Sequence, residues 1–274
     1  MFSLRSFFPD VSIRICDIGA SPHEGNLIPY GKLVEDGVAT VIGFEPLPEE
    51  CRKFNEANPK LKCLPYAVGD GKEATLHKFF APGMASLLQP NRELLSYFVG
   101  FDDWLEPRGE ARVQTHRLDD LEEVGAVDYL KLDTQGSELT ILQNAEKVLR
   151  DVLIIHTEVQ FLPMYLGQPL FGDIDSFLRS AGFVLHVFGM KNFRFVALPD
   201  ALSRHAAEAD AVYVKDFTKW DAMQIESLKK TALVLHDLYS SYALTTLALK
   251  CIDDKINTKF RQRYIALLEK GAKR

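Results

Sequence analysis

Residues 13–21 constrain the fold of this chain more than any other stretch. They read Ile-Arg-Ile-Cys-Asp-Ile-Gly-Ala-Ser, in which the isoleucines favour a buried strand and Asp17 and Gly19 stand where that strand gives way to a loop. A strand that stops at a glycine turn is typical of an open parallel sheet, where ligands bind at the carboxyl ends of the strands. We therefore expect an α/β fold with a ligand site beyond Gly19.

A second apolar run ends in an acid. Residues 38–44 read as the next strand, and Glu45 and Pro46 follow it directly. A carboxylate at the end of that strand can accept two hydrogen bonds from a ribose diol, which predicts a nucleoside-bearing cofactor. The alternative is an ordinary strand–helix–strand turn with a solvated Glu45.

The loop after Gly19 distinguishes three kinds of cofactor. A dinucleotide site uses the pattern G-x-G-x-x-G so that backbone amides can approach a pyrophosphate, but here the next glycine is Gly25 and Glu24 is a poor neighbour for a phosphate. The chain also lacks the P-loop pattern G-x-x-x-x-G-K-[ST]. S-adenosylmethionine carries a ribose and a sulfonium but no phosphate. It suits a glycine turn with an acid before it and another acid at the next strand.

Composition narrows the class of protein. The formal net charge is −6 and the pI is near 5.7, which argues against a nucleic-acid binder that neutralises phosphates. No apolar run is long enough to span a bilayer, and residues 1–10 lack the apolar centre of a signal peptide. The four cysteines contain no CxxC pair, so neither a zinc site nor a disulfide framework is implied. These features predict a cytoplasmic protein with no nucleic-acid or membrane partner.

Alternating strands and helices are expected to continue from the first strand. A helix is predicted over 26–36 with Pro29 in its first turn, and a third strand over 61–67. Asp70 follows that strand, where it would meet an adenine amino group or merely form a turn. Residues 73–80 alternate in polarity and predict a short edge strand.

Residues 81–112 are interrupted by prolines and glycines and read as an excursion from the sheet. Such an excursion would form a lid or a substrate wall. We expect its aromatic residues to form a local core rather than a substrate platform; they are Tyr97, Phe98, Phe101 and Trp104.

A second group of ionisable residues lies at or near the ends of two further predicted strands. The first strand covers 127–133 and ends at Asp133, and the second covers 152–159 and carries His156 and Glu158. Because parallel strands end at the same edge of the sheet, we expect these side chains near the cofactor.

The remaining elements complete the predicted sheet. Ser137 is a natural N-cap for a helix over 137–149, and a strand is expected over 183–188. Runs at 193–197 and 211–214 would form a final hairpin. The predicted fold class is therefore α/β, with a mostly parallel doubly wound sheet that ends in an antiparallel hairpin.

The pattern changes at Phe217. Apolar residues then recur every three or four positions, and neither glycine nor proline interrupts before Gly271. This predicts a helical C-terminal extension, residues 217–274, beside a domain formed by residues 1–216. The extension would form a layer packed on the domain, which we favour, or a surface for homodimerisation.

Five stretches between residues 13 and 190 carry a resemblance to a known family: Asp17-Ile18-Gly19-Ala20, Phe44-Glu45-Pro46, Ala67-Val68-Gly69-Asp70, Arg117-Leu118-Asp119-Asp120-Leu121 and Lys131-Leu132-Asp133-Thr134-Gln135-Gly136-Ser137-Glu138. In these the chain resembles the FkbM-type methyltransferases, which use S-adenosylmethionine and have the class I Rossmann-like fold. The resemblance implies O-methylation of a sugar, a polyketide or another small-molecule acceptor. It also implies cofactor contacts from a set of residues near the strand ends: Asp17, Gly19, Ala20, Ser21, Glu45, Pro46, Asp70 and Asp133.

The chain departs from the family pattern at two places. Ser21 stands where the family usually has an asparagine, and Gly25 comes two residues late. Gln135 stands where the family usually has a glutamate, so a carboxylate role at that position is lost.

Methyl transfer to a hydroxyl needs positioning and is helped by a base. The candidate bases are Asp133, His156 and Glu158, and Asp133 is preferred because it matches the family motif. Lys131 lies two residues earlier on the same strand face and would pair with Asp133. The alternatives are a structural carboxylate at Asp133 and a core histidine at His156.

Two other classes of function stay open from the sequence. A nicotinamide-dependent oxidoreductase would share the sheet but would need a phosphate-binding loop. A non-catalytic S-adenosylmethionine-binding module would keep the pocket and lose the chemistry.

Overall fold

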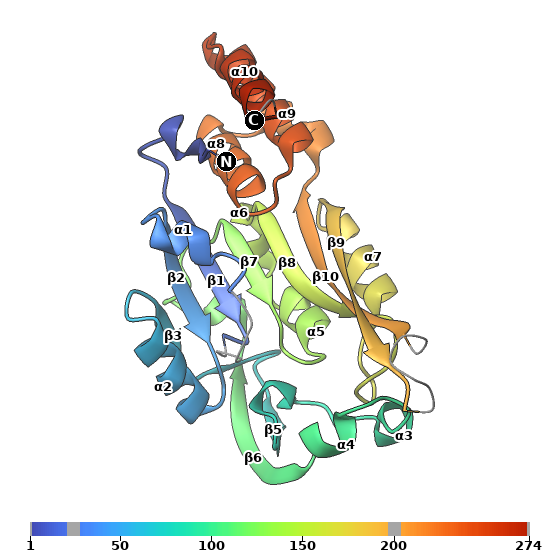
Figure 1. Ribbon diagram of the computed structural model, residues 1–274. Coiled ribbons are helices and arrows are strands. Elements are labelled where there is room, and N and C mark those ends of the chain that lie inside the picture. The colour runs from blue at the N-terminus through green and yellow to red at the C-terminus, as the bar shows by residue number, and fades with distance from the viewer. Residues whose placement is uncertain (1, 21–27, 197–203, 273–274) are drawn as a thin grey trace.

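The computed structural model describes residues 2–20, 28–196 and 204–272. A seven-stranded sheet forms its centre, with helices on both faces and a group of C-terminal helices at one end (Figure 1). The strand order is β3–β2–β1–β7–β8–β10–β9. The strands are β1 (Ile13–Ile18), β2 (Ala39–Phe44), β3 (Lys62–Leu64), β7 (Tyr129–Leu132), β8 (Ile154–Gln160), β9 (Phe183–Arg194) and β10 (Arg204–Lys215).

The sheet has the predicted mixture of strand directions. Five neighbouring strands of this sheet run parallel, namely β3, β2, β1, β7 and β8. Strand β10 is antiparallel to both β8 and β9. In the register, Asp17 lies opposite Gly43 of β2 and opposite Lys131 of β7. The doubly wound, mostly parallel α/β fold with a final antiparallel hairpin is therefore confirmed.

Alternation along the strands gives the sheet two apolar faces. Ile13, Ile15 and Tyr129 contribute to the core on the first face, which is covered by α1 (Gly31–Glu35) and by helices of the C-terminal extension. Leu130 and Ile155 point to the second face, which is covered by α5 (Glu138–Gln143), α6 (Glu146–Asp151) and α7 (Phe171–Ser180). Helix α2 (Pro48–Ala57) packs beside β3.

A second, three-stranded sheet lies below the carboxyl ends of the main strands in Figure 1. It contains β4 (Ala67–Val68), β5 (Glu73–Phe79) and β6 (Pro107–His116), in the order β4–β6–β5. A one-turn helix (Pro82–Met84) and the short helices α3 (Arg92–Leu95) and α4 (Phe101–Trp104) connect β5 to β6, and a second one-turn helix (Leu118–Asp120) follows β6. The predicted edge strand is thus β5.

Three local predictions need correction. Pro29 precedes α1 rather than lying in its first turn, because the helix begins at Gly31, after the buried Tyr30, whose hydroxyl donates to Asp17. The expected start at Asn26 falls outside the described residues. The third strand ends at Leu64, and the chain then crosses to the second sheet. The runs at 183–188 and 193–197 are not separate strands, because β9 continues from Phe183 to Arg194.

The single helix expected over 137–149 is interrupted. It forms α5 and α6, with a break at Asn144 and Ala145. The Asp119 carboxylate accepts hydrogen bonds from the backbone nitrogens of Lys147 (2.9 Å) and Val148 (3.0 Å), so it caps a second helix start that the helical pattern does not reveal. The Ser137 side chain makes no capping hydrogen bond.

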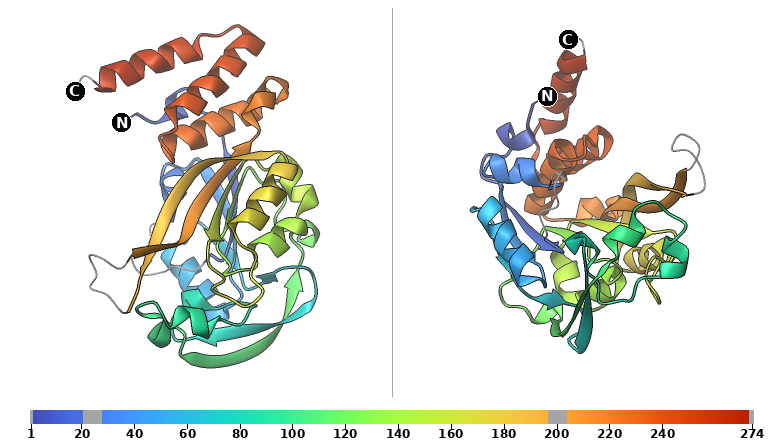
Figure 2. Two further views of the ribbon diagram at one scale, coloured as in Figure 1. Left: turned by 90° about the vertical axis from the view of Figure 1, so that its right-hand side faces the viewer. Right: turned by 60° about the horizontal axis from the view of Figure 1, so that its bottom comes forward.

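The C-terminal extension contains a 3₁₀ helix (Phe217–Ala222) and helices α8 (Ile225–Asp237), α9 (Tyr242–Ile256) and α10 (Phe260–Ala272). These helices stack beyond the amino ends of the parallel strands, with α10 outermost (Figure 2). Buried residues of α8 and α9 share one core with Ile13 and Ile154 of the sheet. The structure therefore agrees with a packed layer, and homodimerisation stays a prediction. No helix within the described ranges is long and apolar enough to cross a membrane.

Tyr239, just beyond α8, links the extension to the sheet. Its hydroxyl lies 2.7 Å from the Tyr129 hydroxyl and 3.1 Å from His156 Nδ1. We expect Tyr239→Phe to lower the free energy of unfolding by about 1–2 kcal/mol, because both partners lose a hydrogen bond in a largely buried place. Urea unfolding measures this, with Tyr97→Phe as a control, because the Tyr97 side chain is 57% exposed. Equal stability of the Tyr239 variant and the unmodified chain would show that the link contributes nothing.

Candidate active site

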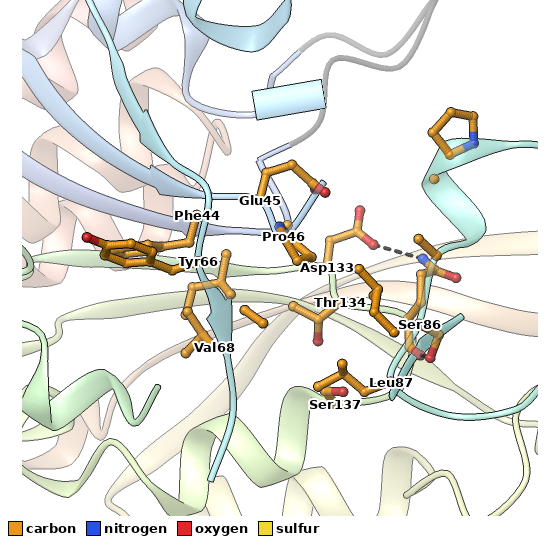
Figure 3. A pocket seen from close by; sticks show the side chains of 18 residues that line it. Phe44, Glu45, Pro46, Tyr66, Val68, Ser86, Leu87, Asp133, Thr134 and Ser137 are labelled. Atoms are coloured by element: carbon orange, nitrogen blue, oxygen red, sulfur yellow. Dashed lines mark hydrogen bonds between the residues drawn. The ribbon is translucent and has the colours of Figure 1, made fainter. Parts of the chain in front are cut away.

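A cavity opens where the carboxyl ends of β1, β2 and β7 meet the second sheet. It has about 600 Å³ of empty space, part of which is open to solvent. Figure 3 shows its side chains converging from the strand ends and from the segment after β5. The lining residues are Ile18, Gly19, Phe44, Glu45, Pro46, Tyr66, Ala67, Val68, Leu76, Pro82, Gly83, Ala85, Ser86, Leu87, Asp133, Thr134, Gln135 and Ser137.

Glu45 is the acid of this cavity at the end of β2. Its side chain is only 6% exposed, and Oε1 accepts a hydrogen bond from the backbone nitrogen of Leu47 at 2.8 Å. Burial raises the pKa of Glu45 to about 7, an effect that the Leu47 hydrogen bond opposes. The carboxylate is thus held in place on the cavity wall, and Oε2 is not used in this hydrogen bond.

The other side of the cavity is apolar. The rings of Phe44 and Tyr66 stack with centroids 6.2 Å apart and an interplanar angle of 19°, and Val68 and Leu87 lie on the same lining. None of the described lining residues is a lysine, an arginine or a histidine. Such a surface suits a planar base and a ribose, and it offers no positive side chain to a phosphate.

Gly19 permits the close approach of β1 and β7. Its φ is +83°, and a Cβ atom at this position would lie 1.8 Å from the carbonyl oxygen of Asp133. Its backbone nitrogen donates to the Phe44 carbonyl oxygen at 2.9 Å. Only glycine fits here without moving the strand ends apart.

Asp133 follows β7 and is half-buried, with 32% of its side chain exposed. Its Oδ1 accepts a hydrogen bond from Gln135 Nε2 at 3.0 Å, and its Oδ2 lies 4.0 Å from Lys131 Nζ. The predicted pairing with Lys131 is therefore a loose contact, and Oδ2 is the freer oxygen of the two.

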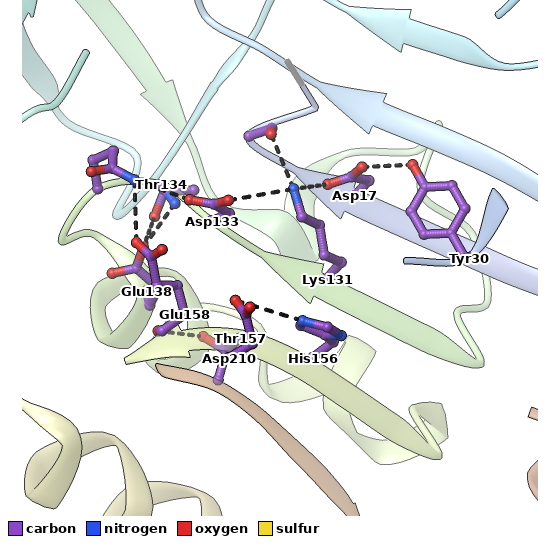
Figure 4. A network of polar contacts seen from close by, with 12 residues as sticks. Asp17, Tyr30, Lys131, Asp133, Thr134, Glu138, His156, Thr157, Glu158 and Asp210 are labelled. Carbon is purple, nitrogen blue, oxygen red and sulfur yellow. Dashed lines mark hydrogen bonds and ion pairs between the residues drawn. The ribbon is translucent and has the colours of Figure 1, made fainter. Parts of the chain in front are cut away.

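Beneath Gly19 lies a buried polar group around Asp17 (Figure 4). Asp17 Oδ2 accepts a hydrogen bond from the Tyr30 hydroxyl at 2.6 Å, and Oδ1 lies 3.0 Å from Lys131 Nζ. Lys131 also donates to the Gly19 carbonyl oxygen at 3.2 Å. Burial tends to lower the pKa of Lys131, but the charges of Asp17 and Asp133 outweigh it and raise that pKa, so Lys131 stays protonated.

A larger and more open hollow adjoins the first cavity on the first face of the sheet. The two share Gly19 and Asp133. The wall of the hollow carries many polar side chains, and among its lining residues are Asp17, Tyr30, Lys131, His156, Lys191, Asp210 and Asp237. Asp133 therefore stands where an apolar cavity and a polar hollow meet.

The other two candidate bases are less accessible than Asp133. His156 lines the hollow, with Nδ1 at 3.1 Å from the Tyr239 hydroxyl and Nε2 at 3.8 Å from Asp210 Oδ1. Glu158 is 4% exposed, and Lys191 Nζ lies 2.8 Å from its Oε1. Burial, with the neighbouring charge of Asp133, raises the pKa of Glu158 well above its usual range.

The structure brings together only part of the predicted cofactor set. Gly19, Glu45, Pro46 and Asp133 line the first cavity, whereas Asp17 faces the hollow. Ala20 is buried in a small core with Cys51, Phe54 and Cys63. Ser21 lies outside the described residues.

Asp70 does not line the cavity. Because the chain crosses to the second sheet after β3, Asp70 comes after β4, where its Oδ2 lies 2.7 Å from Lys72 Nζ. Tyr66, Ala67 and Val68 line the cavity instead. Ala67 and Val68 belong to a stretch that carries the family resemblance, but that stretch pointed to Asp70 as the contact residue. The wall formed by Ser86 and Leu87 had no sequence signal beyond its position in the excursion.

The aromatic residues of the excursion divide into two groups. Phe98 and Phe101 are buried in a local core with Leu95, as expected, whereas Tyr97 and Trp104 are 57% and 45% exposed.

Comparison with known proteins adds a family to this geometry. The family model described as "Methyltransferase FkbM domain" matches residues 17–185, which is more than half of the chain and includes every residue of the first cavity. No curated protein matches the chain.

Solved structures show weaker similarity. Magnesium protoporphyrin IX methyltransferase from Synechocystis PCC 6803 with bound SAM has 14% identity and a TM-score of 0.38, with 75% of this chain and 71% of that chain covered. A TehB-like SAM-dependent methyltransferase from Corynebacterium glutamicum has 13% identity and a TM-score of 0.36, with coverages of 77% and 85%. TM-scores this low carry no argument about the fold, which is established by the strand order. On the family match, the chain belongs to the FkbM methyltransferase family and is a methyltransferase that uses S-adenosylmethionine.

Proposed function

We propose that this methyltransferase transfers a methyl group to a hydroxyl of a small polar metabolite such as a sugar or a polyketide. The adenosine part of the cofactor would occupy the Glu45 cavity, and the acceptor would occupy the adjoining hollow. The observation that carries this proposal is the position of Asp133, which lines both spaces.

The first cavity fits the cofactor. The Glu45 carboxylate would accept hydrogen bonds from the ribose hydroxyls, and Tyr66 and Val68, which line the same cavity, would contact the base. The cofactor carries no phosphate, which agrees with a described lining that has no basic side chain. The oxidoreductase alternative is disfavoured by the sequence after Gly19, which lacks the G-x-G-x-x-G pattern through which backbone amides bind a pyrophosphate.

Asp133 acts as the general base. The cofactor, when bound, supplies an electrophilic methyl group on its sulfonium. Asp133 Oδ2 would take the proton of the acceptor hydroxyl, and Lys131 Nζ, 4.0 Å from Oδ2, would help to hold the carboxylate in place. Gly19 keeps the strand ends close, so the base stays next to the cofactor cavity.

The lining of the hollow supports a polar acceptor. Lys191, Asp210, His156 and Tyr30 offer donors and acceptors around the space next to Asp133. A sugar-like polyol can form further hydrogen bonds to such groups, whereas a purely apolar acceptor would shield them from water and offer none.

Glu45 provides a direct test of the cofactor site. We expect Glu45→Ala to weaken binding of S-adenosylhomocysteine by about 1–3 kcal/mol through loss of the ribose hydrogen bonds. Isothermal titration calorimetry measures this, with Glu49→Ala on the exposed side of α2 as the control. Equal affinity of the Glu45 variant and the unmodified chain would refute this site for the ribose.

The raised pKa of Glu45 gives the test a pH dependence. The ionised carboxylate accepts stronger hydrogen bonds, so cofactor affinity should rise as the pH increases through about 7 and then level off. Glu45→Gln should remove this pH dependence.

The raised pKa of Glu45 has the opposite effect on the stability of the cofactor-free protein. Between pH 4.5 and about 7 the folded chain holds a proton that the unfolded chain has lost. The contribution of Glu45 to the free energy of unfolding therefore falls as the pH rises across that range.

Methyl transfer itself tests the acceptor class. We expect S-adenosylhomocysteine to form in the presence of hydroxyl-bearing sugars, with the product methylated on oxygen as judged by NMR. Cofactor binding without turnover on any member of a broad acceptor panel would favour the non-catalytic binding module instead.

A further inference from the structure

The side chain of Gln135 connects three other side chains of the site. Its Nε2 donates to Asp133 Oδ1 at 3.0 Å and to Glu158 Oε2 at 3.2 Å, so its two N–H groups serve two carboxylates. Its Oε1 lies 3.1 Å from the Tyr165 hydroxyl. All the hydrogen-bonding ends of this amide are therefore engaged.

The backbone of Gln135 is held as firmly as its side chain. Its φ is +55°, a left-handed conformation that a residue other than glycine rarely adopts. Its carbonyl oxygen accepts a hydrogen bond from Ser86 Oγ at 2.7 Å. The Tyr165 hydroxyl also lies 3.0 Å from the Met84 carbonyl oxygen. Gln135 thus joins the ends of β7 and β8 to the wall formed by residues 82–87.

Neither a carboxylate nor an apolar side chain could make this arrangement. A carboxylate has no N–H group to donate, and at this position it would bring a third carboxyl group next to Asp133 and Glu158. An apolar side chain would leave both carboxylates without a donor that their present geometry uses.

We infer that Gln135 is a positioning residue for methyl transfer, whose amide holds the Asp133 carboxylate at the junction of the cofactor cavity and the acceptor hollow by tying it to Glu158. The inference rests on the proposed function in that Asp133 is the base. Through Ser86 and Tyr165 the same residue couples the position of Asp133 to the cavity wall.

The charges around Asp133 set the expected response to pH. Lys131 faces it from β7 and Glu158 from β8; Glu138 at the start of α5 and Glu208 on β10 also interact with it electrostatically. Lys191 from β9 lies against Glu158 and Glu208. A new carboxylate at position 135 adds to the acids of this group, so the base should lose its proton only at higher pH.

The first test measures the pH profile of kcat for Gln135→Glu and Gln135→Leu. We expect Gln135→Glu to shift the acid limb upward by about one pH unit and to recover activity at high pH. Gln135→Leu should lose about tenfold or more in kcat at every pH, without the shift of the acid limb. A Gln135→Glu profile that matches the unmodified chain would overturn the inference.

Product analysis on the same samples tests the proposed function separately. Methylation of a nitrogen or carbon atom would refute the hydroxyl acceptor, whereas a shifted pH profile would still support the role of Gln135.

The second test needs no acceptor. Gln135→Glu would gather three carboxylates about one point, and we expect it to bind Mn²⁺ at least about tenfold more tightly than the unmodified chain, measured by calorimetry. The unmodified protein has no group of three or more His, Cys, Asp or Glu side chains suited to a metal ion within its described ranges. Gln135→Leu serves as the control and should not gain affinity. No gain in Gln135→Glu would show that Asp133 and Glu158 do not converge on this position, and the inference would fail.

Discussion

Replacing Asp133 by asparagine should lower kcat for methyl transfer by about 10²- to 10⁴-fold, the range expected for loss of a general base. Asparagine keeps the size of the side chain and an oxygen that can accept from Gln135, but it cannot take the acceptor proton. The Glu45 cavity is left intact, so affinity for S-adenosylhomocysteine should stay within about twofold. Steady-state kinetics and calorimetry on one preparation measure both quantities.

Asp120→Asn is a suitable control for this substitution. Asp120 also belongs to the sequence stretches that carry the family resemblance, but its side chain is 58% exposed and its contact with Arg117 is 3.9 Å long. Its kcat should match that of the unmodified chain. If Asp133→Asn also transferred methyl groups at the normal rate, Asp133 would be a structural carboxylate and the base would have to be sought elsewhere.

Gly19→Ala should destabilise the protein by about 2–5 kcal/mol. An L-residue at φ +83° costs about 1–2 kcal/mol, and a Cβ atom 1.8 Å from the Asp133 carbonyl oxygen forces the strand ends apart, which adds about 1–3 kcal/mol. The same movement displaces Asp133 from the cavity, so cofactor binding should weaken in parallel. Urea unfolding gives the change in stability, and calorimetry gives the change in affinity.

Gly37→Ala separates the two causes. Gly37 has a φ of +67°, but nothing lies within 4 Å of a Cβ atom built there, so it carries the conformational cost without the collision. We expect it to lose about 1–2 kcal/mol and to bind the cofactor normally. Equal losses in the two variants would mean that β1 and β7 do not meet as closely as the structure has them.

The sequence was sufficient for the features that depend on local pattern. Parallel strands on both sides of the glycine turn are predicted by buried β-branched runs, and Gly19, Glu45 and Asp133 were each recognisable because they directly follow such a run. Strand ends at one edge of a sheet must lie together, and the structure confirms this for these three residues in one cavity.

Features that depend on distant residues could not be read in the same way. The break between α5 and α6 depends on Asp119, which lies 28 residues away from Lys147 along the chain. Asp70 does not line the cavity because β4 pairs with β6 of the second sheet. The sequence around Asp70 does not reveal this pairing, since β6 lies about 40 residues further along the chain. Glu158 was a candidate base because of its position near the end of a predicted strand, yet its carboxylate contacts Lys191 and Gln135. These two residues belong to β9 and to the turn after β7.

The C-terminal extension illustrates a similar division. Its helices were evident from apolar spacing, but the insertion of Tyr239 between Tyr129 and His156 was not. Through this contact His156 has a hydrogen-bond partner in the extension, which gives it a structural role beside its place in the hollow.

A crystal structure of the protein with S-adenosylhomocysteine tests the central claim most directly. We expect both ribose hydroxyls to lie within hydrogen-bond distance of the Glu45 carboxylate, the base to lie near Tyr66 and Val68, and the sulfur to face Asp133. A nucleoside bound elsewhere, or a sulfur directed away from Asp133 and the polar hollow, would contradict this claim.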